Sequence, residues 1–541
     1  MGRIFVALLV VALVTPMAVS QIVEKPIAGD PIKLDSGLVA GKTLASGVKA
    51  YFGVPFAAPP VREFRWKDPQ PVQPWKGVYN ADRKPPMCMQ GMRDHQLNHY
   101  FGEETPSEDC LYVNLWAPAT ARAGQKLPVL VWIYGGGFTQ GTINLANYSG
   151  EQIAKKGVIY LTIAYRVGVF GFMAHSELSA ESPHHSSGNY GLLDLVAGLQ
   201  WVQRNIAQFG GDPGNVTIMG QSAGSAAVSF LQSSPLAKGL FHRAFGMSAS
   251  AVVGGAGRQA TLQEGERNGK LFETAAKAKS IAQLRVLPGD DLFALQGQGG
   301  IRFQRVVDGH FLSATPKQIF DAGKQNDVPV MLGFMHDESS NALRTSKTVD
   351  EYKAAARRLY GERADAFLAL YPVSSDADVK AAGAKAAREA GMETTMRSWA
   401  LAQTKTGKSP VFLNVFSRVH PYVPGATFTD HDPATVGAYH TGEVPYWFQT
   451  QDAYNMFRLT RNWTAWDREL ANKLSDALIA FAKTGDPNTA AIKWPRYDPQ
   501  SEQMMNFGDT IAVQRMNTKG LDFFQVEQTM NRPTSGGRGR R

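Results

Sequence analysis

Gly220-Gln221-Ser222-Ala223-Gly224 is the stretch that decides the fold, because it sets a serine between a predicted strand and a predicted helix. Residues 215–219 (Asn-Val-Thr-Ile-Met) are typical of a buried strand, and residues 225–230 (Ser-Ala-Ala-Val-Ser-Phe) favour a helix. At such a corner the serine backbone is strained and the hydroxyl is held clear of the sheet, so only small residues fit two positions before and after it. The pattern predicts a nucleophile elbow at Ser222.

The pentapeptide needs support from the rest of the chain. With 53 glycines in 541 residues, a Gly-x-Ser-x-Gly motif also arises by chance, and a surface turn is then the alternative interpretation.

A second segment favours the elbow. Residues 129–134 form an apolar run of buried-strand length that ends in three glycines at positions 135–137. Acyl transfer builds negative charge on a carbonyl oxygen, and backbone N–H groups aimed at that oxygen stabilise it. We expect the N–H groups of Gly136, Gly137 and Ala223 to form this oxyanion hole, the alternative being a flexible strand exit.

The chain resembles the type-B carboxylesterase and cholinesterase family of α/β-hydrolases over roughly residues 30 to 510. The resemblance lies in blocks that occur in family order at residues 53–57, 107–114, 164–166, 188–194, 201–202, 209–213, 481–488 and 494–495. It implies an α/β-hydrolase fold with a mainly parallel central sheet flanked by helices. It also implies a serine esterase that needs no metal or other cofactor and acts on a small-molecule ester.

A serine hydroxyl needs a base to take its proton and a carboxylate to orient that base, in the chain order Ser, acid, His. The acid is expected after the apolar strand at 328–334, where the family pattern is Asp-Glu-Gly with a catalytic Glu. The resemblance therefore implies Glu338, with Asp337 as the alternative, because Ser339 replaces the usual glycine. Without the family, adjacent carboxylates after a strand favour a solvated loop or a helix N-cap.

His440 is the expected base. It lies in Gly437-Ala438-Tyr439-His440-Thr441-Gly442-Glu443, which resembles the family block Gly-x-x-His-x-x-Glu. His420 and His431 also follow the acid, but they lack that block. The resemblance further suggests that Ser248 is a hydrogen-bond partner near the triad.

The domain organisation is predicted to be simple. Residues 1–20 read as a signal peptide, with Arg3 before an apolar stretch and a small-residue cleavage site at 18–20. Residues 21–530 form one catalytic domain with a strand at 157–164, a helix at 192–207 and a late helix that carries an apolar stripe from Trp466 and ends near Gly485. Residues 531–541 are a disordered basic tail.

We therefore expect an exported protein, periplasmic or secreted, with no integral membrane segment. Cys88 and Cys110, the two cysteines of the chain, can close a short loop in an oxidising compartment, and the family has a disulfide at this place. The alternative is a pair of buried free thiols. The net charge of +9 owes much to the arginine-rich tail, so a solubilising tail is favoured over nucleic-acid binding. No metal-binding motif occurs, and His184-His185 is expected in a surface loop. The oligomeric state is not predicted.

The substrate is inferred from departures from the family. Cholinesterases carry an acidic residue before the serine and a tryptophan in the cysteine-bounded loop, whereas this chain has Gln221 and no tryptophan between the cysteines. Choline esters are therefore not expected. The same loop offers side chains that suit a carboxylate-bearing ester, namely Arg93, His95, His99 and Tyr100. The alternatives are a broad esterase for short acyl or aryl esters and a binding module without catalysis.

Overall fold

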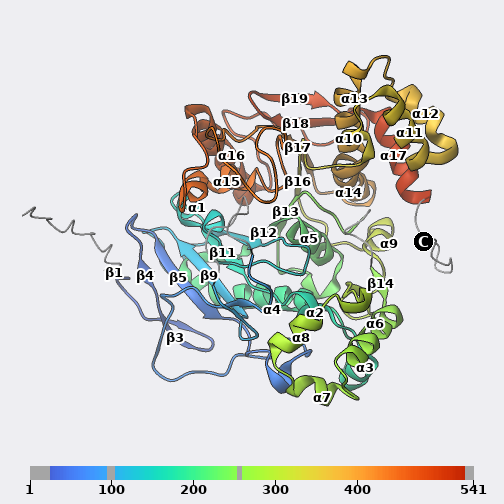
Figure 1. The fold of residues 1–541 in the computed structure, drawn as a ribbon. Coiled ribbons are helices and arrows are strands. Elements are labelled where there is room, and N and C mark those ends of the chain that lie inside the picture. Colours follow the sequence, from blue (N-terminus) through green and yellow to red (C-terminus); the bar gives the residue numbers. More distant parts are fainter. Residues whose placement is uncertain (1–24, 94–103, 253–258, 531–541) are drawn as a thin grey trace, which may run out of the picture.

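A twelve-stranded sheet forms the centre of the chain in a computed structural model that describes residues 25–93, 104–252 and 259–530 (Figure 1). From one edge to the other, the strands are β1 (Lys25–Pro26), β4 (Lys42–Thr43), β5 (Lys49–Pro55), β9 (Tyr112–Ala117), β11 (Ile159–Ile163), β10 (Leu127–Ile133), β12 (Gly211–Gln221), β13 (Arg243–Met247), β16 (Val330–Met335), β17 (Val411–Phe416), β18 (Gln503–Phe507) and β19 (Ile511–Arg515).

The sheet is parallel in its middle and antiparallel at its edges. The run from β11 through β10, β12, β13, β16 and β17 to β18 pairs in parallel. The strands on the β1 side and the last pair are antiparallel. Central strands such as β10 and β11 are almost wholly buried and apolar, as expected for parallel strands covered on both faces. The predicted α/β architecture is confirmed.

Helices cover the sheet. They are α1 (Glu151–Ala154), α2 (Gly168–Phe172), α3 (Ser176–Glu181), α4 (Tyr190–Asn205), α5 (Ala223–Ser233), α6 (Leu262–Ala275), α7 (Ile281–Val286), α8 (Gly289–Leu295), α9 (Pro316–Asp321), α10 (Ala342–Thr345), α11 (Val349–Tyr360), α12 (Ala364–Leu370), α13 (Asp376–Arg388), α14 (Thr394–Thr406), α15 (Val444–Phe448), α16 (Ala465–Thr484) and α17 (Thr518–Met530). In Figure 1, α10 to α13 and α17 gather in one group beside the β17 to β19 edge. No helix within the described ranges is long and apolar enough to cross a bilayer.

The predicted elements have close counterparts. The strand expected at 157–164 is β11, and the helix expected at 192–207 is α4 followed by a 3₁₀ turn that ends at Gly210 with φ of 93°. The helix with the Trp466 stripe is α16, and it ends at Gly485, whose φ of 80° suits a glycine C-cap.

Three small sheets lie outside the central one. They are formed by β2 (Ile32–Leu34), β3 (Gly37–Ala40) and β6 (Val78–Asn80), by β7 (Met87–Cys88) and β8 (Pro106–Ser107), and by β14 (Ala260–Thr261) and β15 (Val306–Val307). Cys88 is joined to Cys110 by a disulfide, as the resemblance implied. The predicted signal peptide and the predicted basic tail lie outside the described residues.

Candidate active site

Ser222 occupies a sharp corner between β12 and α5. Its backbone has φ of 58° and ψ of −126°, a region that residues with a side chain rarely adopt. The Ser222 N–H donates to the carbonyl of Met247 in the neighbouring strand β13, over 2.8 Å, and this bond helps to hold the corner. Backbone strain of about 1–3 kcal/mol is retained only where the surroundings enforce it, and such positions cluster at functional sites.

The glycines around the serine are required by close backbone approach. A Cβ atom on Gly224 would lie 2.1 Å from the carbonyl oxygen of Ile133 at the end of β10. A Cβ on Gly220 would lie 2.4 Å from the backbone carbonyl carbon of Gly224. The tight packing expected of a strand-to-helix elbow is therefore present on both sides of Ser222.

The glycine run after β10 lies against the serine. A Cβ on Gly135 would be 2.9 Å from the Cβ of Ser222, and Gly136 and Gly137 have φ of 110° and 67°. Within the described residues, no hydrogen bond takes up the N–H of Gly136, Gly137 or Ala223. Because Ala223 is the first residue of α5, its N–H is one of those left without a partner inside the helix. All three remain available to a bound oxyanion.

Glu338 and His440 meet. The Glu338 carboxylate accepts the N–H of Met335 through Oε1 over 2.8 Å, and its Oε2 lies 2.5 Å from Nδ1 of His440. The glutamate side chain is 1% exposed and the imidazole 41%, so a buried carboxylate supports a ring that solvent reaches. Desolvation lowers the pKa of His440, but the hydrogen bond and the charge of Glu338 raise it above its usual value.

Asp337 points elsewhere. It accepts the N–H of Ala438 through Oδ2 over 2.9 Å and contacts His336 Nδ1 through Oδ1 over 3.0 Å. Its backbone N–H also donates to the carbonyl of Ala438. Asp337 therefore fastens the loop that carries His440 rather than the imidazole itself.

Gln221 also contacts the imidazole of His440. Its amide nitrogen lies 3.2 Å from Nε2 of His440 and 3.4 Å from Nδ1. In the part of the chain that the structure describes, no hydrogen bond joins the Ser222 hydroxyl to His440. No sequence pattern predicts this contact, apart from the position of Gln221 next to the serine.

The other candidate histidines are engaged elsewhere. His420 is buried, with Nε2 2.8 Å from the carbonyl of Gly442 and Nδ1 2.9 Å from the Tyr439 hydroxyl, and burial lowers its pKa. His431 contacts Asp430 and Tyr422, both over 2.9 Å. Neither ring contacts Glu338, as that of His440 does.

Several buried polar groups lie close to this centre without a hydrogen-bond partner among the described residues, and two of them bear on the site. They are the hydroxyl of Ser248 and the carboxyl of Glu443, which is 3% exposed. The hydrogen bond expected for Ser248 is thus not formed within that part of the chain. Burial, reinforced by the charge of Glu338, raises the pKa of Glu443 to about 8, so this carboxyl is protonated at neutral pH.

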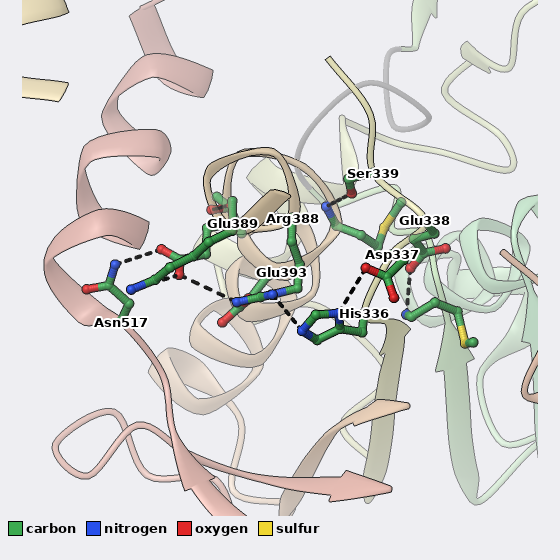
Figure 2. A network of polar contacts seen from close by, with 12 residues as sticks. His336, Asp337, Glu338, Ser339, Arg388, Glu389, Glu393 and Asn517 are labelled. Atoms are coloured by element: carbon green, nitrogen blue, oxygen red, sulfur yellow. Dashed lines mark hydrogen bonds and ion pairs between the residues drawn. The ribbon is translucent and has the colours of Figure 1, made fainter. Parts of the chain in front are cut away.

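A polar network connects the turn after β16 to the helical group (Figure 2). Arg388 at the end of α13 donates to Nε2 of His336 over 2.7 Å and to Glu393 over 3.0 Å. Glu389 accepts from Asn517, just before α17, over 2.7 Å. Ser339, the departure from the family glycine, accepts the N–H of Met392 over 3.1 Å, from a π-helical turn at Glu389–Glu393. The turn that carries Glu338 is therefore held from outside the sheet.

Of the loop residues expected to contact substrate, Arg93 is half-buried, whereas His95, His99 and Tyr100 lie outside the described residues.

The chain is similar to known esterases over most of its length. The model of the carboxylesterase family matches residues 29–524. The fumonisin B1 esterase of Sphingopyxis macrogoltabida is 36% identical over 493 residues, which cover 88% of this chain and 86% of that protein. The para-nitrobenzyl esterase of Bacillus subtilis (strain 168) is 32% identical over 510 residues, covering 88% and 94%. A solved structure of a PNB esterase superposes with a TM-score of 0.74 at 29% identity, covering 91% of this chain and 98% of that one. The predicted α/β-hydrolase fold is confirmed.

Proposed function

We propose, from the premise that this chain belongs to the carboxylesterase family and is a carboxylic ester hydrolase, that it acts through an acyl-enzyme on esters that carry free carboxylates. The tricarballylate side chains of fumonisin are one such ester.

The proposed chemistry uses the groups that meet at the elbow. His440 Nε2 takes the proton of the Ser222 hydroxyl as its oxygen attacks the ester carbonyl, and Glu338 holds the imidazole and stabilises its charged form. The N–H groups of Gly136, Gly137 and Ala223 bind the oxyanion. The alcohol leaves with the proton from His440. Water then attacks the acyl-enzyme while His440 takes a proton from it, and the acid is released as that proton returns to the Ser222 oxygen.

This sequence of steps requires a small movement at the imidazole. The amide of Gln221 now lies beside Nε2, the nitrogen that must accept the serine proton. The Gln221 side chain must therefore release Nε2 when Ser222 and substrate engage it. This is consistent with the loose contacts that catalytic groups often show before substrate binds.

The preference for carboxylates is supported by a cation near the glycine run. The guanidinium of Arg305 lies 4.5 Å from the ring centre of Phe138, the residue that follows Gly137. Burial lowers the pKa of Arg305 to about 10, so it keeps its charge at pH 7. A half-buried arginine in this position offers a partner for a substrate carboxylate, because partial burial strengthens its field.

The second candidate is a broad esterase for short acyl or aryl esters. It is favoured by the para-nitrobenzyl esterase relative, whose match covers 88% of this chain, the same share as the match to the fumonisin B1 esterase. A third candidate, a binding module without catalysis, would require that a fluorophosphonate probe fails to label Ser222.

The test compares kcat/KM for fumonisin B1 with that for neutral p-nitrophenyl butyrate, at low and high salt, with Ser222→Ala as the blank. We expect a preference for fumonisin that salt weakens. Arg305→Gln should reduce this preference, whereas the exposed neighbour Arg302→Gln should not. A preference for the butyrate that ignores salt and Arg305 would favour the broad esterase.

We also propose that the protein is exported, to the periplasm or beyond. The Cys88–Cys110 disulfide supports this, since such bonds persist in oxidising compartments. Fractionation of the producing cells with antibody detection tests it, and a protein found only in the cytoplasm with reduced cysteines would refute it.

A further inference from the structure

Three side chains distant in sequence meet at a place that the proposed chemistry does not use. Asp68, His184 and His310 each offer one ligand atom, and these atoms all lie within 4.8 Å of one another. The two imidazole rings are stacked, with centroids 3.6 Å apart and planes 7° from parallel. We propose that these residues form a binding site for one divalent transition-metal ion of the Zn²⁺ type.

The donor atoms of this cluster are not used by other contacts. Among the described residues, no hydrogen bond or ion pair engages the carboxylate of Asp68 or a ring nitrogen of His184 or His310. A second cluster with similar composition contrasts with it. There, His175 Nε2 binds Glu273 over 2.8 Å and His175 Nδ1 accepts the N–H of Glu177, so those ring nitrogens are already satisfied. Of these two clusters, the first alone has ligand atoms that no other residue of the described chain engages.

The two histidine loops are fastened to each other. Asn189, five residues after His184, donates to the carbonyl of Val306 and to the carboxylate of Asp308, each over 2.9 Å. Its side-chain oxygen also accepts the N–H of Val306 over 3.1 Å. Asp308 in turn accepts the N–H of His310 over 3.2 Å. The histidine positions are therefore set by the backbone and not by chance contact of long side chains.

The third ligand is also anchored. Trp66, two residues before Asp68, is 1% exposed and donates its indole N–H to the carbonyl of Val169 over 3.0 Å. A site assembled on three fastened segments loses little conformational freedom when an ion binds.

The chemistry of the set fits a metal of intermediate softness. Two imidazoles and a carboxylate are typical ligands of Zn²⁺, which takes water as a fourth ligand where the protein supplies three. His184 is exposed and His310 half-buried, so a ring can turn from the stack until both lone pairs converge on one ion. Bound there, the ion would cross-link three surface segments.

The test measures Zn²⁺ binding to the full chain, without a histidine tag, by competition with a chromophoric chelator. We expect one high-affinity Zn²⁺ per chain. His184→Asn and His310→Asn should each weaken binding by more than the roughly 10- to 100-fold that the loss of an outer partner costs. His185→Asn is the matched control, because His185 is an exposed neighbour and asparagine tolerates its φ of 52°.

Two further readouts separate a defined site from loss of folding. Zn²⁺ should raise the melting temperature of the unsubstituted protein but not that of His184→Asn, while both hydrolyse ester at the same rate without metal. Co²⁺ should give the absorption bands of a four-coordinate ion that disappear in His310→Asn. The proposal is overturned if the unsubstituted protein binds no Zn²⁺, or if His184→Asn and His310→Asn bind it as tightly as His185→Asn does.

Discussion

Replacing Glu443 by glutamine should change how the stability of the protein depends on pH. The carboxyl is buried, and its pKa is about 8 in the folded protein, against a usual value of 4.5. Between these two values the folded chain keeps a proton that the unfolded chain has released. The favourable contribution of this group is therefore complete below pH 4.5 and is lost as pH rises toward 8. The slope for one proton is about 1.4 kcal/mol per pH unit.

The replacement by glutamine keeps the size of the side chain and removes the titration. The unfolding free energy of both proteins is measured in urea at pH 5, 6, 7 and 8. We expect the difference between the variant and the unsubstituted protein to shift in favour of Glu443→Gln as pH rises, by at most about 1.4 kcal/mol for each unit of pH and by roughly 3–4 kcal/mol between pH 5 and pH 8. A difference that stays constant over this range would show that Glu443 ionises as it does in water, and would refute the assignment of a buried, protonated carboxyl.

The remaining predictions concern the reaction and the elbow. Ser222→Ala should lower kcat by about 10⁴- to 10⁶-fold with circular dichroism unchanged; a loss below tenfold would remove the serine from the mechanism. Glu338→Gln should lower kcat/KM by roughly 10⁴-fold, whereas Asp337→Asn should cost much less; the reverse order would make Asp337 the acid. Because Glu338 helps to raise the pKa of His440, kcat/KM should rise with pH through a midpoint above 6.5, and a midpoint at or below this value in a pH profile would contradict that effect. Gly224→Ala places a Cβ 2.1 Å from a backbone oxygen, so it should lower the unfolding free energy by about 1–3 kcal/mol together with turnover; unchanged melting and turnover would show that the corner yields freely.

The fold was largely predictable because its signals are local. The apolar runs that became β10 and β12 are of buried-strand length, and each ends in glycines where the backbone must turn or approach closely. The same holds for α16: its apolar stripe predicted the buried face of the helix, and Gly485 predicted where the helix ends. The family resemblance implied only a mainly parallel sheet, and the order of its twelve strands was not predicted, because strand pairing joins segments that lie far apart in the sequence.

The site was predictable only where family motifs marked it. The contact between Glu338 and His440 joins residues 102 positions apart, and no local pattern distinguishes Glu338 from Asp337. The Gln221 contact with His440 depends on side-chain directions at the corner, which a one-dimensional pattern does not contain. His184 was expected to be a plain surface residue, and only the folded chain shows that it stacks on His310.

The network of Figure 2 suggests how the protein would lose activity during storage. Asn517 stands at the entrance to α17, and through Glu389 and Arg388 it is linked to the turn that carries Glu338. A protease cut or mild warming that frees α17 would loosen that turn while the central sheet stays whole. Esterase activity would then fall before a loss of secondary structure can be measured. A stored sample could therefore keep its circular dichroism spectrum and still be inactive.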